Sequence, residues 1–136
     1  RMNLAEQVLI KENHLRCLNE ADPESAVRRA VELARAEAPQ DVMVEVEVET
    51  MNELDAALDA GADLVLLDNM DVEQVRLAAD KTAERRDEDE YPRIEASGGI
   101  TLENVRDYAE AGADRISIGA LTHSAPAMDL SLQLEL

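Results

Sequence analysis

Residues 42–68, VMVEVEVETMNELDAALDAGADLVLLD, hold a complete strand–helix–strand unit, and this unit decides the fold. Apolar residues alternate with glutamate over Val42–Val48, which predicts a strand with one apolar face. Thr50-Met51-Asn52-Glu53 has the spacing of a capping box, so we expect a helix that begins there and ends before Gly61. The apolar run Asp63–Asp68 then predicts a second strand.

The same unit recurs in the second half of the chain. Thr50…Glu53-Leu54…Ala60-Gly61-Ala62-Asp63 is repeated as Thr101…Asn104-Val105…Ala111-Gly112-Ala113-Asp114, with an offset of 51 residues (61 to 112, and 63 to 114). Around these two copies, similar signals predict strands at Gln7–Lys11, Arg93–Ser97 and Arg115–Gly119, helices at 22–37, 71–84 and 101–111, and a half-buried terminal strand at Leu130–Leu136.

Alternating strands and helices with short connections predict right-handed βαβ units and a parallel sheet. Such a repeat suits either a barrel or an open sheet, and a complete (β/α)₈ barrel needs about 250 residues. Because the 136-residue chain supplies only five main strands, we predict an α/β fold. Residues 1–136 would then be one domain, an incomplete (β/α) barrel that corresponds to its second half or more.

The composition limits the core and the cellular setting. Hydrophobic residues make up 46% of the chain but only two residues, both Tyr, are aromatic, which suits parallel strands covered by helices. No apolar run is long enough to span a bilayer and no N-terminal signal region is visible, so we expect neither membrane insertion nor export. The single cysteine excludes an internal disulfide and favours a reducing, cytoplasmic location.

Acidic residues dominate the charge. Asp and Glu number 31 against 13 Lys and Arg, giving a net charge of −18, and such a chain is a poor partner for DNA or RNA. Only Lys11 and Lys81 are lysines, and the other basic residues are arginines. Excess carboxylate with little lysine is typical of a halophilic protein, whose self-repulsion is screened by salt. An acidic protein of ordinary origin is the alternative.

Function in a (β/α) barrel lies at the C-terminal ends of the strands. Lys11 ends the first strand, and we interpret it as an anion contact, with a chance surface lysine as the alternative. Asp68 ends the third strand, where a turn-forming aspartate is the equal alternative. Glu45, Glu47 and Glu49 share one face of the second strand, and the pattern does not decide whether Glu47 faces the lumen or the helices.

The repeat places glycines where its other copy has carboxylates. Glu47 plus 51 is Gly98, and Asp68 plus 51 is Gly119. Glycine between a strand and a helix lets a phosphate approach backbone N–H groups, and the loops after late barrel strands are the usual phosphate site of this fold. We therefore predict one phosphate site on two glycine loops, Ser97-Gly98-Gly99 and Ile118-Gly119-Ala120. The alternative is that each loop is only a turn.

Five motifs follow one another in order along the chain. They are Lys11-Glu12-Asn13-His14, Glu45-Val46-Glu47-Val48-Glu49, Leu67-Asp68-Asn69-Met70, Glu95-Ala96-Ser97-Gly98-Gly99-Ile100, and Ser117-Ile118-Gly119-Ala120-Leu121-Thr122-His123 followed by Asp129-Leu130-Ser131-Leu132. No motif is sufficient singly. Together they resemble the quinolinate phosphoribosyltransferase family, also called carboxylating nicotinate-nucleotide pyrophosphorylases, from Arg1 to the last residues.

The resemblance implies a cytoplasmic enzyme of NAD synthesis. Such an enzyme converts quinolinate and phosphoribosyl pyrophosphate to nicotinate mononucleotide, pyrophosphate and CO₂, with Mg²⁺. By resemblance, Arg1 and Lys11 hold the carboxylates of quinolinate, and Glu47 and Asp68 face the ribose, with Mg²⁺ near them but bound through the substrate. Lys11, Glu47 and Asp68 are the implied catalytic residues. The two glycine loops hold the 5-phosphate, with His123 near it.

The resemblance also implies parts that these 136 residues do not contain. We expect an N-terminal α/β-sandwich domain, the early barrel strands and further substrate-binding Arg and Lys residues to lie outside the chain. The family works as a dimer or larger assembly. Two other functions stay open at this point, namely a non-catalytic half-barrel that needs a partner half, and the related pyrophosphorylase-like protein of molybdate transport.

Overall fold

The computed structural model describes residues 7–18, 20–86, 92–122 and 127–134. Its strands are β1 (Gln7–Ile10), β2 (Met43–Val48), β3 (Leu64–Asp68), β4 (Arg93–Ser97) and β5 (Arg115–Ile116). Its helices are α1 (Glu12–Cys17), α2 (Pro23–Glu37), α3 (Met51–Asp59), α4 (Val72–Ala83) and α5 (Val105–Glu110), and a short 3₁₀ helix, Gly119–Leu121, follows β5.

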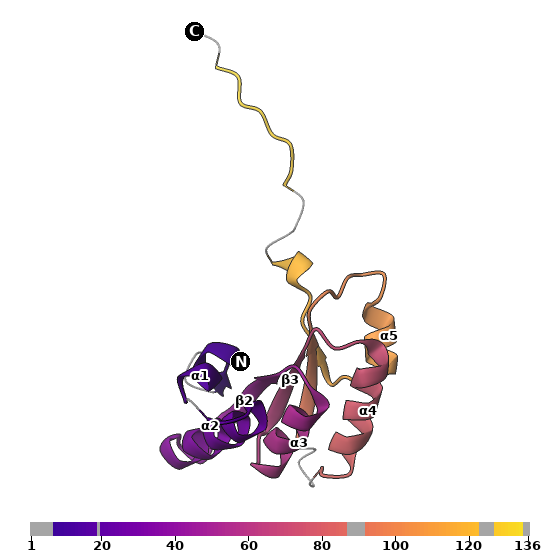
Figure 1. Ribbon diagram of the computed structural model, residues 1–136. Helices are drawn as coiled ribbons and strands as arrows, with labels where there is room; N and C mark the ends of the chain where they lie inside the picture. The colour runs from indigo at the N-terminus through magenta and orange to yellow at the C-terminus, as the bar shows by residue number, and fades with distance from the viewer. Residues whose placement is uncertain (1–6, 19, 87–91, 123–126, 135–136) are drawn as a thin grey trace.

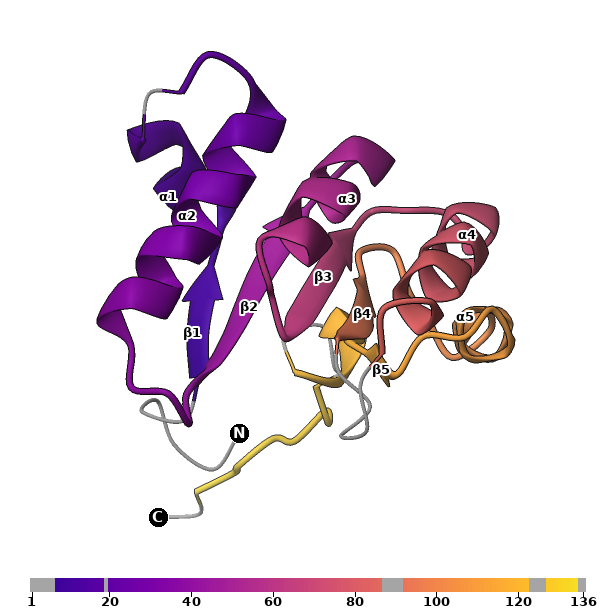
Figure 2. The same ribbon diagram turned by 90° about the horizontal axis from the view of Figure 1, so that it is seen from below.

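The five strands form one parallel sheet, and their order in space is their order in the chain, β1-β2-β3-β4-β5. Helices α2 to α5 follow one face of this sheet (Figure 1 and Figure 2). A doubly wound sheet would reverse its strand order and carry helices on both faces, so this arrangement is that of a (β/α) barrel. In the described residues β1 does not pair with β5, and the sheet is open. The predicted α/β fold, a partial barrel, is confirmed.

The helix-covered face of the sheet holds the hydrophobic core. Val44, Val46 and Val48 of β2 are at most 1% exposed and belong to one cluster with Leu54 of α3. Since side chains alternate along a strand, Glu47 points to the opposite face, which corresponds to the lumen of a barrel. We call this opposite side of the sheet the lumen face. The structure thus settles the orientation that the sequence pattern leaves undecided.

Side-chain caps start the three longest helices where the sequence predicts them. The Asp22 carboxylate accepts a hydrogen bond from the Ser25 N–H at 2.8 Å at the start of α2. Thr50 and Glu53 form both arms of the capping box of α3, and Asp71 caps α4. These bonds satisfy N–H groups that have no partner within the helix, so they fix where each strand-to-helix loop ends.

Within the sheet and its helices, three elements differ from the expectation. The helix expected at 101–111 begins only at Val105, because the Thr101 N–H donates to Asn104 Oδ1 and residues 102–104 form a turn. The strand expected at Arg115–Gly119 ends at Ile116, and the 3₁₀ helix follows. The pattern does not predict α1, because its six residues are shorter than the window over which helical periodicity shows.

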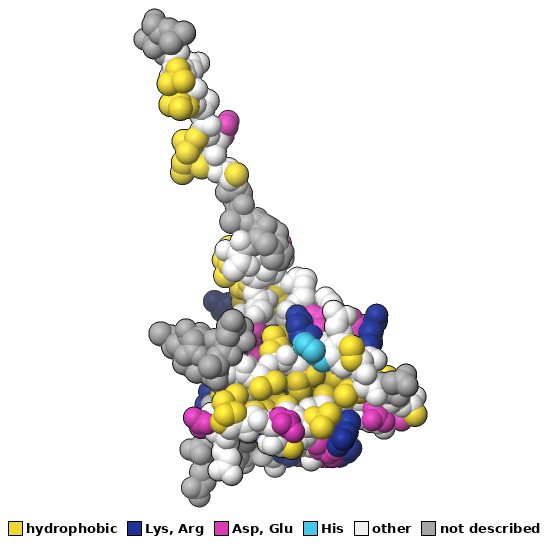
Figure 3. Space-filling model, turned by 90° about the vertical axis from the view of Figure 1, so that its left-hand side faces the viewer, with side chains coloured by type: hydrophobic (Ala, Val, Ile, Leu, Met, Phe, Trp, Pro, Cys, Tyr) yellow, Lys and Arg dark blue, Asp and Glu magenta, His cyan; other side chains and the backbone are white. Residues whose placement is uncertain are grey.

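The terminal strand expected at Leu130–Leu136 is wrong over the part of it that the structure describes. Residues 127–134 have no regular structure and extend away from the sheet (Figure 1). Leu130, Leu132 and Leu134 are 80–86% exposed, and the hydrophobic side chains along this segment are visible in Figure 3. Alternation gives the segment an apolar side, but a strand forms only against a partner that takes up its N–H and C=O groups.

Candidate functional site

Polar side chains gather on the lumen face near the carboxyl ends of the strands. In the strand register Glu47 lies opposite Leu66 of β3, and Leu66 lies opposite Glu95 of β4. At the end of β3, Asp68 lies opposite Ser97. Because the strands are parallel, their C-terminal ends lie at one edge of the sheet, and the predicted Glu47, Asp68 and Ser97 lie at that edge together.

Lys11 and Glu47 form an ion pair that joins the ends of β1 and β2. Lys11 Nζ lies 3.1 Å from Glu47 Oε2, and the Lys11 side chain is 54% exposed while that of Glu47 is 14% exposed. The backbone of Lys11 is held by α1, because its N–H donates to His14 Nδ1 at 2.9 Å. An ion pair with so exposed a lysine contributes little to stability, so Lys11 can exchange Glu47 for an anionic ligand at small cost.

Asp68 lies partly exposed at the end of β3. Asn69 Nδ2 donates to Asp68 Oδ2 at 2.8 Å, and the Asn69 N–H donates to the Ser97 carbonyl oxygen at 2.9 Å. The cap of α4 is Asp71, so capping that helix is not the role of Asp68. Among the described residues the other carboxylate oxygen of Asp68 has no hydrogen-bond donor, which leaves it available to a ligand.

The two glycine loops line one pocket of about 640 Å³. The structure therefore brings together six of the residues predicted for the phosphate site, Ser97, Gly98, Gly99, Ile118, Gly119 and Ala120. Lys11, Glu47 and Asp68 do not line this pocket themselves. The phosphate-binding role of the two glycine loops stays a prediction, but one ligand can reach both loops at once.

Backbone conformation explains why both Gly98 and Gly99 are glycines, and close packing is a second reason at Gly98. Gly98 has φ +94° and Gly99 has φ +62°, a region that side-chain-bearing residues rarely adopt. A Cβ on Gly98 would lie 2.7 Å from Asn69 Cγ, whereas a Cβ on Gly99 would meet nothing within 4 Å. Gly98 is thus required by the approach of Asn69 as well as by its φ, and this structural reason stands beside the predicted phosphate role.

A second pocket, of about 410 Å³, lies between α1 and the first residues of α2 and α3. Glu47 and Glu49 line it from the end of β2, and Glu12, Glu20 and Glu53 add further carboxylates. Arg16 also lines this pocket, but its guanidinium is paired with Glu12. Glu47 therefore borders an acidic hollow on one side, while its bond to Lys11 links it to the strand ends.

The described residues include carboxylate oxygens that could bind a cation, but they do not form a complete metal site. No group of three or more His, Cys, Asp or Glu side chains is placed there to hold a metal ion. Glu47 and Asp68 are carboxylates, and Mg²⁺ is commonly held by one or two carboxylates together with phosphate oxygens of a substrate. The donor set therefore fits Mg²⁺ that arrives with a substrate. Among the described helices, none is both long and apolar enough to cross a membrane.

Two residues implied by the family resemblance, Arg1 and His123, lie outside the described residues. Two further residues, Asn69 and Ser117, lie in the candidate site although the sequence analysis does not single them out. Asn69 bridges Asp68 and the loop at Ser97, and Ser117 lines the glycine pocket while its Oγ donates to Glu95 Oε1 at 2.6 Å. Asparagine directly after a strand-ending aspartate is the available signal for Asn69, because asparagine tolerates the left-handed conformation.

The chain matches the family model described as "Quinolinate phosphoribosyl transferase, C-terminal domain" over residues 1–133. It is 39% identical over 136 residues to the human nicotinate-nucleotide pyrophosphorylase [carboxylating], covering 98% of this chain and 42% of the human protein. It is 40% identical over 134 residues to the probable enzyme of that name from Methanothermobacter thermautotrophicus, covering 98% and 46%. The chain thus spans less than half the length of these relatives.

Solved structures agree with these relatives. A NadC deletion mutant superposes with a TM-score of 0.77 at 37% identity, covering 95% of this chain and 41% of that one. NadC from Streptococcus pyogenes gives a TM-score of 0.71 at 36% identity, covering 98% and 42%. Motifs, strand order and these matches agree, and the chain belongs to the quinolinate phosphoribosyl transferase family, as a match to its C-terminal domain.

Proposed function

We propose that the full-length protein transfers the phosphoribosyl group of phosphoribosyl pyrophosphate to quinolinate and releases CO₂, giving nicotinate mononucleotide and pyrophosphate. The observation that carries the proposal is the shared pocket of the two glycine loops, at the same strand ends as Lys11, Glu47 and Asp68. The relatives are named nicotinate-nucleotide pyrophosphorylase [carboxylating], and this name supports the same reaction.

Each part of the site suits one part of the substrates. The backbone of the glycine loops allows close approach of the 5-phosphate, since glycine has no side chain in the way. Lys11, with Arg1 beyond the described residues, is proposed to hold the carboxylates of quinolinate. When Lys11 turns to a substrate carboxylate, its ion pair with Glu47 is released, and Glu47 becomes free to face the ribose.

The chemistry develops charge where these carboxylates lie. The bond between ribose C1 and the pyrophosphate oxygen breaks, and pyrophosphate leaves with the electron pair. The quinolinate ring nitrogen bonds to C1, and positive charge on the ribose is stabilised by Glu47 and Asp68 along the way. The carboxylate next to the ring nitrogen then leaves as CO₂, and a proton takes its place.

Mg²⁺ belongs to this proposal as a companion of the substrate. Glu47 and Asp68 are the residues that would lie near it, with phosphate oxygens as further ligands. The ion would neutralise charge on the leaving pyrophosphate. The residues of this chain contribute orientation and negative charge.

The proposal extends to the setting of the protein. An N-terminal domain and earlier barrel strands would complete the site, and the protein would act as a homodimer or larger assembly. We place it in the cytoplasm, and the net charge of −18 supports a salt-rich, halophilic cytoplasm.

The test is formation of nicotinate mononucleotide from quinolinate by the full-length protein. Asp68→Asn is expected to lower kcat by at least about a hundredfold, because it removes a charge that stabilises the transition state, while the fold stays intact. Asp80→Asn, on an exposed face of α4, is the matched control and should keep full activity. No product from quinolinate would favour the molybdate-associated relative or a non-catalytic half-barrel, and an unchanged Asp68→Asn variant would remove Asp68 from the mechanism.

A further inference from the structure

Asn69 lies between the carboxylate of Asp68 and the glycine loop Ser97–Gly99. Its side-chain amide donates to Asp68, and its N–H donates to the Ser97 carbonyl oxygen. Its Cγ fills the space that a Cβ on Gly98 would need. We propose that Asn69 is a positioning residue that couples occupancy of the phosphate pocket to the orientation of the Asp68 carboxylate. This inference rests on the proposed function and deepens it.

The direction of the amide follows from the chemistry of its neighbours. A carboxylate only accepts hydrogen bonds, so the Asn69 nitrogen must face Asp68 and its oxygen must face Gly98. The bond holds Oδ2 of Asp68 and leaves the other carboxylate oxygen for the ribose. Asn69 therefore selects which oxygen of Asp68 is presented to a substrate.

The backbone of Asn69 gives this contact its rigidity. Asn69 has φ +55°, and among the described residues it is the single non-glycine residue with a positive φ. The bond from its N–H to Ser97 ties this unusual conformation to the end of β4. A residue held at both its backbone and its amide moves together with the loop that it touches.

The loop in turn forms a wall of the phosphate pocket. Ser97, Gly98 and Gly99 line the pocket, and Gly98 lies so close to Asn69 that no Cβ would fit between them. A phosphate that fixes the loop therefore also fixes Asn69, and through it Asp68. An empty pocket leaves the loop, and with it the carboxylate, less restrained. Substrate binding and charge placement are thereby linked over a short chain of direct contacts.

The test compares two asparagines that contact the same loop, Asn69 at Ser97 and Gly98 and Asn104 at Gly99. Asn69→Gly keeps a residue that tolerates positive φ and removes the side chain that reaches Asp68. Asn104→Ala is the matched control, because Asn104 Nδ2 donates to the Gly99 carbonyl oxygen at 3.2 Å but makes no described contact with Asp68. In the full-length protein, Asn69→Gly should lower kcat at least about tenfold, as expected for a lost hydrogen bond to a charged group. Asn104→Ala should raise KM for phosphoribosyl pyrophosphate with little change in kcat.

A double variant separates positioning from simple damage. If Asn69 acts through Asp68, Asn69→Gly should have no further effect on kcat in an Asp68→Asn background. Equal kcat losses in Asn69→Gly and Asn104→Ala, or additive losses in the double variant, would overturn the inference while the proposed function stands.

An NMR titration with inorganic phosphate tests the coupling without catalysis. The ¹³C carboxyl signal of Asp68 should shift on titration of the wild type and stay in place in Asn69→Gly. A signal that does not move in the wild type, or that moves equally in the variant, contradicts the coupling. Absence of product from quinolinate, with the Asp68 signal still responding through Asn69, overturns the proposed reaction and leaves the coupling in place.

Discussion

Lys11 and Gly119 are predicted to serve different ligands at the same end of the sheet. Lys11→Ala removes an accessible ammonium and should weaken quinolinate binding about tenfold or more, with little effect on phosphoribosyl pyrophosphate. Gly119→Val adds a side chain to the pocket that we propose for phosphate and should show the opposite preference. Calorimetric titration of each variant with each ligand measures both effects.

Lys81→Ala is the control for the lysine, because Lys81 is the only other lysine and, in the last turn of α4, pairs with Asp55 of α3 and not with Glu47. It should bind both ligands as the wild type does. If Lys11→Ala and Gly119→Val lose the same ligand, the proposed division of the site between the two anions is wrong.

The same substitution, glycine to alanine, at Gly98 and at Gly99 tests the effect of close packing on stability. Alanine at either position meets a positive φ, which costs roughly 1–2 kcal/mol. Only Gly98→Ala also collides with Asn69, and such overpacking adds about 1–3 kcal/mol. Urea unfolding should therefore show Gly98→Ala to be less stable than Gly99→Ala by about 2 kcal/mol. Equal stabilities would mean that Asn69 moves aside easily.

Residue patterns in the sequence predict which residues belong to the candidate site, but they do not predict where their side chains point. The strand ends and the repeat lead to Lys11, Asp68 and the glycine loops without any coordinates. The direction of Glu47 depends on which face of the sheet the helices cover, and this is a property of the assembled fold. The link from Asn69 to Gly98 also joins residues that are adjacent only through the pairing of β3 with β4.

At the scale of elements, the cap of α2 makes a contribution to stability that depends on pH. The Ser25 backbone N–H donates to Asp22 and, with the Ser25 and Glu24 side chains, lowers its pKa below the ordinary 3.8. A carboxyl whose pKa is lower in the folded state stabilises the fold above its unfolded pKa. That stabilisation is lost as the pH falls from about 3.8 through the folded pKa.

Asp22→Asn provides the matched variant, because asparagine caps a helix about as well as aspartate and does not titrate. Its free energy of unfolding should be close to that of the wild type at pH 7. Below pH 3.8, urea titrations should show the wild type losing more stability than the variant. Equal losses of stability in the two proteins would show that folding does not lower the pKa of Asp22.

Helix starts are predictable here because they are local. Asp22, Thr50 and Asp71 each bond to a residue three positions later, so the signal lies within a few letters of sequence. The terminal strand fails for the opposite reason, because it depends on a partner strand at an unspecified distance. The alternation of Leu130, Leu132 and Leu134 gives the segment one apolar side, but an apolar side alone does not supply a partner strand.

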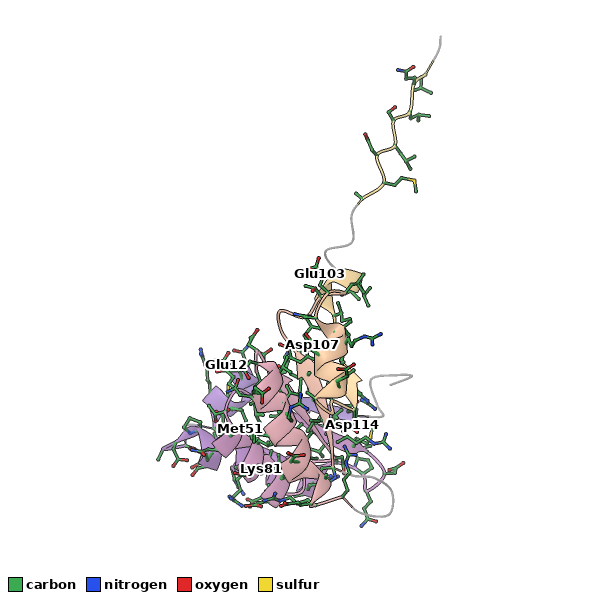
Figure 4. All side chains as sticks on the ribbon, turned by 90° about the vertical axis from the view of Figure 1, so that its right-hand side faces the viewer. Glu12, Met51, Lys81, Glu103, Asp107 and Asp114 are labelled. Atoms are coloured by element: carbon green, nitrogen blue, oxygen red, sulfur yellow. The ribbon has the colours of Figure 1, made fainter. Side chains whose placement is uncertain are left out.

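At the scale of the whole molecule, two electrostatic effects oppose each other. Ion pairs join α2, α3, α4 and the turn after α4 on the helix surface: Arg28 with Asp59, Lys81 with Asp55, and Arg85, which follows α4, with Asp55 and Asp59. Figure 4 shows Lys81 on the outer side of α4. Salt weakens such exposed pairs, each worth about 0–1 kcal/mol. Salt also screens the repulsion within a chain of net charge −18, and this acts on the whole surface.

We expect the repulsion to outweigh the pairs, so the free energy of unfolding should rise as KCl is raised from dilute buffer towards molar levels. The matched variant replaces four exposed acids that form no ion pair among the described residues, through Glu20→Gln, Asp80→Asn, Glu84→Gln and Glu103→Gln. These changes reduce the net charge from −18 to −14 (−18 plus 4). With less repulsion to screen, the variant should be more stable than the wild type in dilute buffer and should gain less from salt. Circular dichroism during urea unfolding at each KCl concentration measures both slopes. A wild type that loses stability with salt would instead make the ion pairs between α2, α3 and α4 the dominant effect.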